Sequence, residues 1–157
     1  MRLIGISALV LFVLDQASKF VVLRILHLDT RFAIDVLPPF FNLRMAWNRG
    51  INFGLFANDA AVMRWALVAL AVVIATVIAV WAARSLRHPL NHVLAGVLIG
   101  GALGNALDRV LHGAVVDFVN MSCCGIANPY AFNLADAGIF AGALGLALVS
   151  GMLEKRA

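Results

Sequence analysis

Four long apolar segments constrain this chain more than any other feature. They cover residues 3–26, 62–83, 89–108 and 134–153. A helix needs about 20 mainly apolar residues to cross the hydrocarbon of a bilayer. The whole chain is 63% hydrophobic and 13% charged, whereas soluble domains have about 45–50% apolar and about 25% charged residues. The sequence therefore predicts one integral-membrane domain, 1–157, built as an all-α bundle of four transmembrane helices.

The first apolar segment also has some features of a cleaved signal peptide. Arg2 precedes a run of apolar residues, 3–14, whose length suits the hydrophobic region of such a peptide. A cleavage site with small residues at both key positions is missing, however, because Asp15 would occupy position −3 if cleavage followed Ala17. We therefore expect the segment to be kept as a membrane helix.

The distribution of basic residues predicts the orientation in the membrane. Four spans place both termini on one side, where Arg2, the short loop 84–87 and the C-terminal 155–156 carry closely spaced basic residues. The positive-inside rule makes that side cytoplasmic, which leaves 27–61 and 109–133 as external segments. The net charge of +4 comes from scattered basic residues, a pattern that fits a membrane surface rather than a nucleic acid.

The first external segment contains an alternating stretch. Apolar side chains alternate with more polar or small ones: Phe41, Leu43, Met45 and Trp47 against Asn42, Arg44, Ala46 and Asn48. A period of two predicts a strand with one apolar face. A turn is expected at 48–50, and the alternation resumes over 51–55. The sequence thus predicts a small external amphipathic β-sheet that lies on the membrane.

Small residues recur at helical spacing in the last two apolar segments. Gly96, Gly100 and Gly104 form two overlapping GxxxG steps, and Gly138 and Gly142 form another. Such steps allow helix backbones to approach closely in lipid, although glycine is also simply common in membrane helices. We expect the third and fourth segments to pack together.

Several polar residues interrupt the apolar segments. An ionised Asp or Lys at mid-helix opposes insertion by roughly 2.5–3.5 kcal/mol. Asp15 and Lys19 are four residues apart, so they share one helix face and either neutralise each other or contact a substrate. Asn105, Asp108 and Arg109 form a polar face at the outer end of the third segment. An ion pair at the helix end is the alternative interpretation for the last two.

Two further aspartates fall at the same outer end. Asp117 is flanked by Val116 and Phe118, and Asp136 lies three residues after Asn133. Helix capping explains Asn133 and accounts for an acid in the first turn, but it does not explain Asp117. Two neighbouring carboxylates share a proton, and one can then activate water while the other polarises a carbonyl group. The spacing suggests an aspartic protease.

The histidines and cysteines are not expected to form a metal site. His88 and His92 are four apart but lack an acidic partner nearby, so we interpret them as interfacial residues rather than zinc ligands. Cys123 and Cys124 are adjacent, and a disulfide between neighbours closes a strained ring. Buried or interfacial free thiols are expected.

Five sequence blocks follow one another in order: LDQASK at 14–19, NRG at 48–50 followed by FG at 53–54, GGALGNALDR at 100–109, VVDF at 115–118 and FNLAD at 132–136. In these blocks the chain resembles the lipoprotein signal peptidases, also called signal peptidase II. Two features depart from the family pattern, namely the arginine at position 49 and the cysteine-containing stretch 121–128. Neither touches the two aspartates.

The resemblance implies a fold, an activity and a site. The fold would be a four-helix bundle with an external β-cradle and a short periplasmic helix. The activity would be removal of signal peptides from prolipoproteins, just before a cysteine that carries diacylglycerol, with no metal or cofactor. The enzyme would act in the bacterial inner membrane on its periplasmic side, with both termini cytoplasmic. Its catalytic pair would be Asp117 and Asp136, and its supporting polar residues would be Asp15, Lys19, Asn48, Asn105, Asp108, Arg109 and Asn133.

The implied partners are diacylglyceryl-modified prolipoproteins and membrane lipids, with no nucleic acid and no obligate protein partner. One alternative function is a small multi-span transporter or proton conductor, in which the intramembrane charges form a relay. That function predicts charges spread across the bilayer depth, whereas most of them cluster at one end. A second alternative, a non-catalytic assembly partner that packs through its glycine faces, leaves Asp117 unexplained.

Overall fold

Four long helices, two short helical segments and a three-stranded sheet make up the computed structural model, which describes residues 1–50, 60–125 and 128–154. The helices long enough to cross a membrane are α1 (Arg2–Phe20), α3 (Ala60–Ser85), α4 (Pro89–His112) and α5 (Leu134–Glu154). α1 continues as a π-helical segment, η1 (Val21–Ile25), which is followed by the short helix α2 (Leu28–Arg31). The predicted fold class is confirmed.

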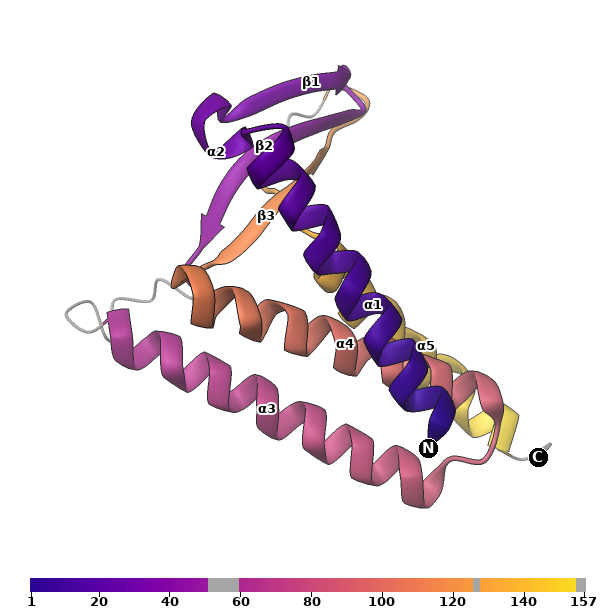
Figure 1. Ribbon diagram of the computed structural model, residues 1–157. Helices are drawn as coiled ribbons and strands as arrows, with labels where there is room; N and C mark the ends of the chain where they lie inside the picture. The colour runs from indigo at the N-terminus through magenta and orange to yellow at the C-terminus, as the bar shows by residue number, and fades with distance from the viewer. Residues whose placement is uncertain (51–59, 126–127, 155–157) are drawn as a thin grey trace.

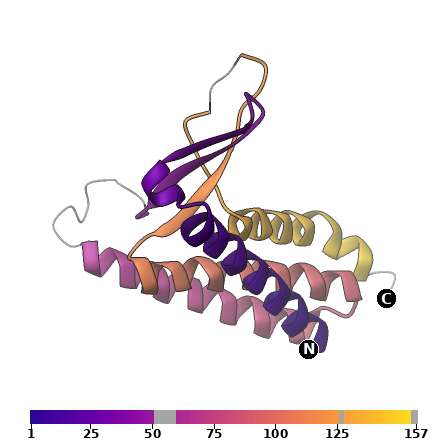
Figure 2. The same cartoon turned by 45° about the horizontal axis from the view of Figure 1, so that its top comes forward.

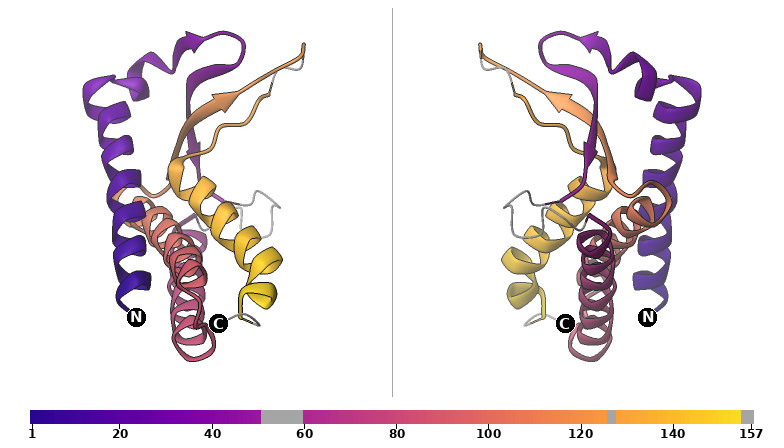
Figure 3. Two further views of the ribbon diagram at one scale, coloured as in Figure 1. Left: turned by 90° about the vertical axis from the view of Figure 1, so that its right-hand side faces the viewer. Right: turned by 90° about the vertical axis from the view of Figure 1, so that its left-hand side faces the viewer.

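α4 is the central helix of the bundle. It packs against α1, α3 and α5, whereas α3 contacts only α4 extensively among the described helices. The sheet stands at one end of the bundle, and both termini lie at the opposite end (Figures 1 and 3). The turn between α3 and α4 lies at the same end as the termini (Figure 1).

α4 extends to His112, four residues past the predicted end. Its C-cap is Gly113, whose φ of 77° is left-handed and whose N–H donates to the Arg109 carbonyl oxygen at 3.0 Å. Glycine adopts this conformation without the strain that a Cβ atom causes. Asp108 and Arg109 therefore belong to the last turns of the helix, with their side chains held by a rigid backbone.

His88 and His92 bond to the backbone near the α3–α4 turn. His88 is the N-cap of α4, and its Nδ1 accepts from the Leu90 N–H at 3.3 Å. Pro89 fills the first position of the helix, where a missing N–H is harmless. His92 Nε2 lies 2.9 Å from the Leu86 carbonyl oxygen. In the described ranges, no three His, Cys, Asp or Glu side chains are grouped as a metal site.

The sheet has the order β1–β2–β3, with β1 (Ala33–Leu37), β2 (Phe41–Asn48) and β3 (Val115–Met121) all antiparallel. The strand predicted over 41–48 is confirmed as β2. The second strand, expected over 51–55, lies outside the described residues. The strands that pair with β2 are β1 and β3, and neither was predicted. β3 was missed because its sequence is mostly apolar and shows no alternation.

The apolar face of the sheet packs on η1 and α2, which follow α1. Leu43 of β2 and Val116 and Phe118 of β3 are buried against Val22 and Leu28. Successive side chains of a strand point to opposite faces. Asp117, between two buried apolar residues, therefore points away from this cluster.

The glycines at helical spacing serve two interfaces. A Cβ atom on Gly100 would lie 2.3 Å from the Ala8 carbonyl oxygen, and one on Gly96 would meet Ser7 and Ile4, so both glycines face α1. On the other side of α4, Gly101 faces the Ala135 carbonyl oxygen, and Gly142 of α5 faces Leu94 and Leu98. The predicted packing of α4 on α5 is correct, but the GxxxG steps of α4 pack on α1.

Candidate active site

The two aspartates of the predicted pair meet around Asn133. The Asn133 side-chain amide donates to Asp117 Oδ1 at 2.6 Å, and the Asn133 backbone N–H donates to Asp136 Oδ2 at 3.2 Å. Asp117 comes from the middle of β3, and Asp136 comes from the first turn of α5. Asn133 is thus the residue that couples a strand carboxylate to a helix carboxylate.

Asn133 and Asp136 also form a reciprocal cap at the start of α5. Asn133 Oδ1 accepts from the Asp136 N–H at 2.8 Å, while Asp136 Oδ2 accepts from the Asn133 N–H. This is the exchange seen in a capping box. The capping interpretation is correct for both residues, and it does not compete with a catalytic one, since the cap fixes the Asp136 side chain toward Asp117.

Each of the four carboxylate oxygens of the pair accepts one described N–H bond. Asn48 Nδ2 donates to Asp117 Oδ2 at 3.0 Å, and Asn105 Nδ2 donates to Asp136 Oδ1 at 2.7 Å. Asn48 is held by its own turn, because its Oδ1 accepts from the Gly50 N–H at 3.0 Å. The donors are all neutral amides, which orient the carboxylates without adding a full positive charge.

Asp117 lies in an environment that disfavours its charge. Its residue is 3% exposed, and burial, with a further contribution from the charge of Asp136, raises the pKa of Asp117 from 3.8 to about 6. The amides of Asn48 and Asn133 act in the opposite direction. A carboxyl group with a pKa in this range can both hold and release a proton near neutral pH.

A buried cluster of charges lies next to the two aspartates. Lys19 Nζ lies 2.7 Å from Asp15 Oδ2 and 2.7 Å from Asp108 Oδ2, with all three residues almost fully buried. Asp15 Oδ1 accepts from the Ala135 N–H and Asp108 Oδ2 accepts from the Val116 N–H, each at 3.0 Å. These N–H groups belong to the residues just before Asp136 and Asp117. The cluster therefore ties α1, α4, β3 and α5 together beside the two aspartates.

All nine residues named from the sequence form one connected network. Lys19 Nζ donates to Asn105 Oδ1 at 3.2 Å, and Asn133 Nδ2 donates to the same oxygen at 3.1 Å. Arg109 joins through its NH1 bond to the Asn105 backbone oxygen at 3.2 Å. Asp15 and Lys19 pair with each other, which is one of the two alternatives considered for them, whereas the ion pair considered for Asp108 and Arg109 is replaced by one between Asp108 and Lys19.

Gln16 is a member of this network that the sequence reasoning missed. Its Nε2 donates to Asp108 Oδ1 at 3.0 Å and to the Gly104 carbonyl oxygen at 3.3 Å. A polar residue inside an apolar span is itself a signal of an interior position. Gln16 could have been identified on that ground.

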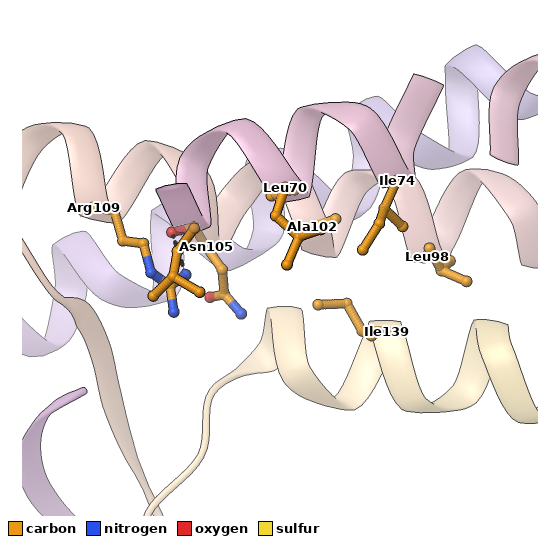
Figure 4. Close-up of a pocket in the computed structure, with 9 residues that line it drawn as sticks. Leu70, Ile74, Leu98, Ala102, Asn105, Arg109 and Ile139 are labelled. Carbon is orange, nitrogen blue, oxygen red and sulfur yellow. Dashed lines mark hydrogen bonds between the residues drawn. The ribbon is translucent and has the colours of Figure 1, made fainter. Parts of the chain in front are cut away.

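A pocket of about 260 Å³ opens between α3, α4 and α5 and reaches the site (Figure 4). Its walls are apolar, with Leu70 and Ile74 from α3, Ala102 from α4 and Ile139 from α5. Asn105 and Arg109 form its polar end (Figure 4). The buried Nε of Arg109 makes no hydrogen bond within the described part of the chain, so a donor remains available there.

The two cysteines lie away from this site. Cys123 and Cys124 follow the end of β3, and both are free thiols as expected, but they are exposed, so the buried alternative is wrong. Their mutual hydrogen bond raises the pKa of the Cys123 thiol. A raised pKa lowers the thiolate fraction, so the position lacks the character of a reactive cysteine.

Comparisons with known proteins agree on one family. A family model described as signal peptidase (SPase) II matches residues 7–152. A lipoprotein signal peptidase of Methylobacterium sp. (strain 4-46) is 43% identical over 144 residues, which cover 92% of this chain and 86% of the relative. One of Burkholderia mallei (strain SAVP1) is 38% identical over 141 residues, covering 90% and 82%.

Two solved structures of bacterial membrane enzymes share the fold. Their TM-scores are 0.73 and 0.74, each at 24% identity. The first alignment covers 94% of this chain and 85% of the other, and the second covers 92% and 90%. At this identity the likeness concerns the arrangement of helices and strands.

Proposed function

The chain belongs to the signal peptidase II family, and we propose that Asp117 and Asp136 are the catalytic pair that hydrolyses its peptide substrate. It is a bacterial inner-membrane, multi-pass peptidase that removes signal peptides from prolipoproteins. The observation that carries the proposal is the bridge through Asn133, which brings two carboxylates from different elements to one end of the bundle. With this pair the enzyme is an aspartic endopeptidase.

The chemistry follows from one proton shared by two carboxylates. The ionised carboxylate takes a proton from water, and the resulting hydroxide attacks the scissile carbonyl carbon. The protonated carboxyl group donates its proton to the carbonyl oxygen, which gives a neutral tetrahedral gem-diol. When the C–N bond breaks, the leaving amine receives the proton taken from water, and the other carboxyl group recovers its own proton from the diol.

The position of the pair suits a lipid-modified substrate. The substrate of this proposal is a prolipoprotein cut before a diacylglyceryl-cysteine, whose lipid and signal helix both stay in the bilayer. The pocket between α3, α4 and α5 offers an apolar surface at membrane depth and ends at Asn105 and Arg109. The free Nε donor of Arg109 can bond to the substrate backbone there, while apolar parts of the substrate occupy the walls.

The orientation proposed for the chain has both termini and the α3–α4 turn in the cytoplasm. The start of α1 and the end of α5 lie at the end away from the sheet (Figure 3), where Arg2 begins α1, and closely spaced basic residues near a span favour the cytoplasmic side. The catalytic pair then faces the periplasm. A reporter fused after Ala157 should be active as a cytoplasmic fusion, and a periplasmic reading would place the pair on the wrong side for this substrate.

A proton conductor or transporter is not favoured. The charges near the bundle axis gather at the sheet end, in a network that also includes backbone N–H groups of β3 and α5. A relay across the bilayer needs titratable groups along its depth. The lower part of the bundle instead contains a buried apolar cluster that includes Ile4, Leu98 and Leu146.

Incubation of the purified protein with a diacylated prolipoprotein tests the proposed function. Release of the signal peptide is expected, and the same prolipoprotein without diacylglycerol is the control that tests substrate choice. Equal cleavage of both forms would contradict the role of the lipid. No cleavage of either form by well-folded protein would contradict the function.

A further inference from the structure

The two carboxylates of the pair have different surroundings. Asp136 lies in the first turn of α5, where the helix dipole favours a negative charge, and its side chain is partly exposed. It accepts a backbone N–H and the Asn105 amide. Asp117 lies in a strand, is almost fully buried, and accepts only two neutral side-chain amides in the described structure. The surroundings of Asp136 favour a charge more than those of Asp117.

Asn105 connects Asp136 to a cation. Lys19 Nζ donates to Asn105 Oδ1 at 3.2 Å, and Asn105 Nδ2 donates to Asp136 Oδ1 at 2.7 Å. An ammonium group on the oxygen of a carboxamide polarises the group, which strengthens its N–H as a donor because hydrogen bonds in a chain reinforce each other. A stronger donor stabilises the ionised form of the carboxylate that accepts from it.

We infer that Lys19 acts through Asn105 as a positioning residue that keeps Asp136 ionised, so that Asp136 activates the water and Asp117 carries the shared proton. The inference rests on the proposed function and adds to it the direction of proton transfer. Asp136 takes a proton from water as the new C–O bond forms, and Asp117 gives its proton to the scissile carbonyl oxygen. Asp136 then protonates the leaving amine, and Asp117 recovers its proton from the diol.

Among the charges around the pair, that of Asp136 affects the pKa of Asp117 most, and the smaller effect of Lys19 lowers that pKa. Lys19 and Asp15 face the pair from α1, and Asp108 and Arg109 face it from α4. Burial raises the pKa of Asp117 most, and the charge of Asp136 raises it further. This is the behaviour of a pair that holds one proton between its members.

A charge-matched variant tests the role of Lys19. Lys19→Met alone leaves Asp15 and Asp108 without their buried cation, so it can fail to fold. Lys19→Met combined with Asp15→Asn keeps the formal charge of the cluster at the wild-type value and leaves an oxygen at position 15 to accept from the Ala135 N–H. Asp15→Asn alone is the control that retains the Lys19–Asn105 bond.

The readout is the pH–rate profile for signal-peptide release, with kcat and KM measured separately and folding checked by thermal melting. In Lys19→Met/Asp15→Asn we expect kcat to fall about tenfold relative to Asp15→Asn, because one charge-assisted link is lost. KM should change less than threefold. The acidic limb should move up by about one pH unit, since the base is then harder to ionise. A purely structural role would leave that limb in place.

Asn105→Ala is a second test, because it removes the amide between Lys19 and Asp136 but keeps Lys19, Asp15 and Asp108. It should move the acidic limb in the same direction. Adding Lys19→Met/Asp15→Asn to Asn105→Ala should move the acidic limb little further, because the proposed effect of Lys19 on Asp136 passes through Asn105. Additive losses, or a folded variant with an unmoved acidic limb, would overturn the role of Lys19. Absence of signal-peptide release by the wild-type protein would instead overturn the proposed function.

Discussion

α3 and α4 are both long enough to cross a membrane, yet the more apolar of the two is the less buried. α3 is the most apolar of the four spans, and only 11% of its apolar window is buried, whereas α4 is the least apolar and 61% of its window is buried. Figure 2 shows α4 between the other helices, with α3 at the periphery. In a soluble protein the most apolar helix would be expected at the centre.

The difference arises because lipid is as apolar as a leucine side chain. No hydrophobic force drives α3 inward, so its large side chains can face the acyl chains. α4 is buried instead through close backbone approach at Gly100 and Gly101 and through the polar contacts of Asn105 and Asp108. In this protein, apolarity marks exposure to lipid, and polar or small residues mark the core.

The largest effect on activity should come from the polar residues at the site rather than from α3. Asp117→Asn and Asp136→Asn should each lower the rate of signal-peptide release by at least about 10²-fold, because Asn keeps the size of Asp but cannot act as an acid or base in water activation. The double variant should be little worse than either single variant. Thr76→Val on α3 is the control, since Thr76 Oγ1 bonds only within its own helix, to the Val72 oxygen at 2.8 Å, among the described contacts.

The measurement is the rate of signal-peptide release by each purified variant that still shows a thermal unfolding transition. Thr76→Val should remain within about twofold of wild type, as is usual for surface changes. A folded Asp117→Asn enzyme with near wild-type activity would exclude Asp117 from the mechanism. A large loss in Thr76→Val would show that α3 contributes more to the site than its exposure suggests.

Asp117 should also lower the stability of the protein at neutral pH. Its pKa is raised from 3.8 to about 6 in the folded state, so the neutral form favours folding. That contribution is fully present below pH 3.8 and is lost as the pH rises through about 6. The free energy of unfolding therefore falls by at most about 3 kcal/mol between acidic and neutral pH. In Asp117→Asn this fall should be absent.

Melting temperatures between pH 4 and pH 7.5 provide the measurement. Asp117→Asn should melt above the wild type at pH 7 and close to it near pH 4, because the difference arises only when Asp117 ionises. The control is Asp35→Asn, a change at an exposed carboxylate paired with Arg44 on the sheet edge. A constant difference between wild type and Asp117→Asn across this range would contradict the linkage.

The close approach of α4 to α1 should be sensitive to a single methyl group. A Cβ atom at Gly100 would lie 2.3 Å from the Ala8 carbonyl oxygen and 3.0 Å from two further backbone atoms. Backbone atoms cannot move aside as a flexible side chain can, so Gly100→Ala should destabilise the protein by about 1–3 kcal/mol.

Gly5→Ala in α1 is the matched control, because a Cβ atom there meets nothing within 4 Å. It should be neutral or stabilising by up to about 1 kcal/mol, since Ala favours a helix more than Gly does. Thermal melting in detergent compares the two. Equal stability of the Gly100→Ala variant and the wild type would show that the helices can separate without loss.

The smallest effects should separate the two faces of α3. Ala75 is 6% exposed and faces the apolar cluster, whereas Val73 is 57% exposed. Ala75→Leu should destabilise by about 1–3 kcal/mol through overpacking. Val73→Leu should stay within about 0.5 kcal/mol. Similar melting temperatures for the two variants would remove the distinction between the faces of α3.

The order of the candidate residues along the chain already indicated most of the site. Asp15 and Lys19 were identified because ionised groups inside an apolar span need partners, and Asn133 because it precedes a helix. The same reasoning could also have identified Gln16, which was overlooked, but it could not reveal the backbone N–H groups of Val116 and Ala135 that complete the network. Backbone donors carry no signal in a sequence, since every residue except proline has one.

The sheet shows a second limit. The alternation over 41–48 predicted β2 because that strand has one apolar and one polar face. β3 has six of its seven residues buried or half-buried, so its apolar run did not distinguish strand from loop or helix. Its pairing with β2 depends on contacts between residues about 70 positions apart, which no local pattern specifies.

The sequence by itself determined that four helices cross the membrane, that polar residues gather at one end of them, and that two aspartates fall there. These properties depend on segment length and on the free energy of placing charges in lipid, both of which are local. Only the tertiary structure decided which helix is central, which glycines face α1, and that Lys19 joins Asp15 to Asp108 while Asn133 joins Asp117 to Asp136. Those outcomes depend on how α1, α4, β3 and α5 meet in space, because a hydrogen bond requires distance and direction, and neither is present in residue spacing.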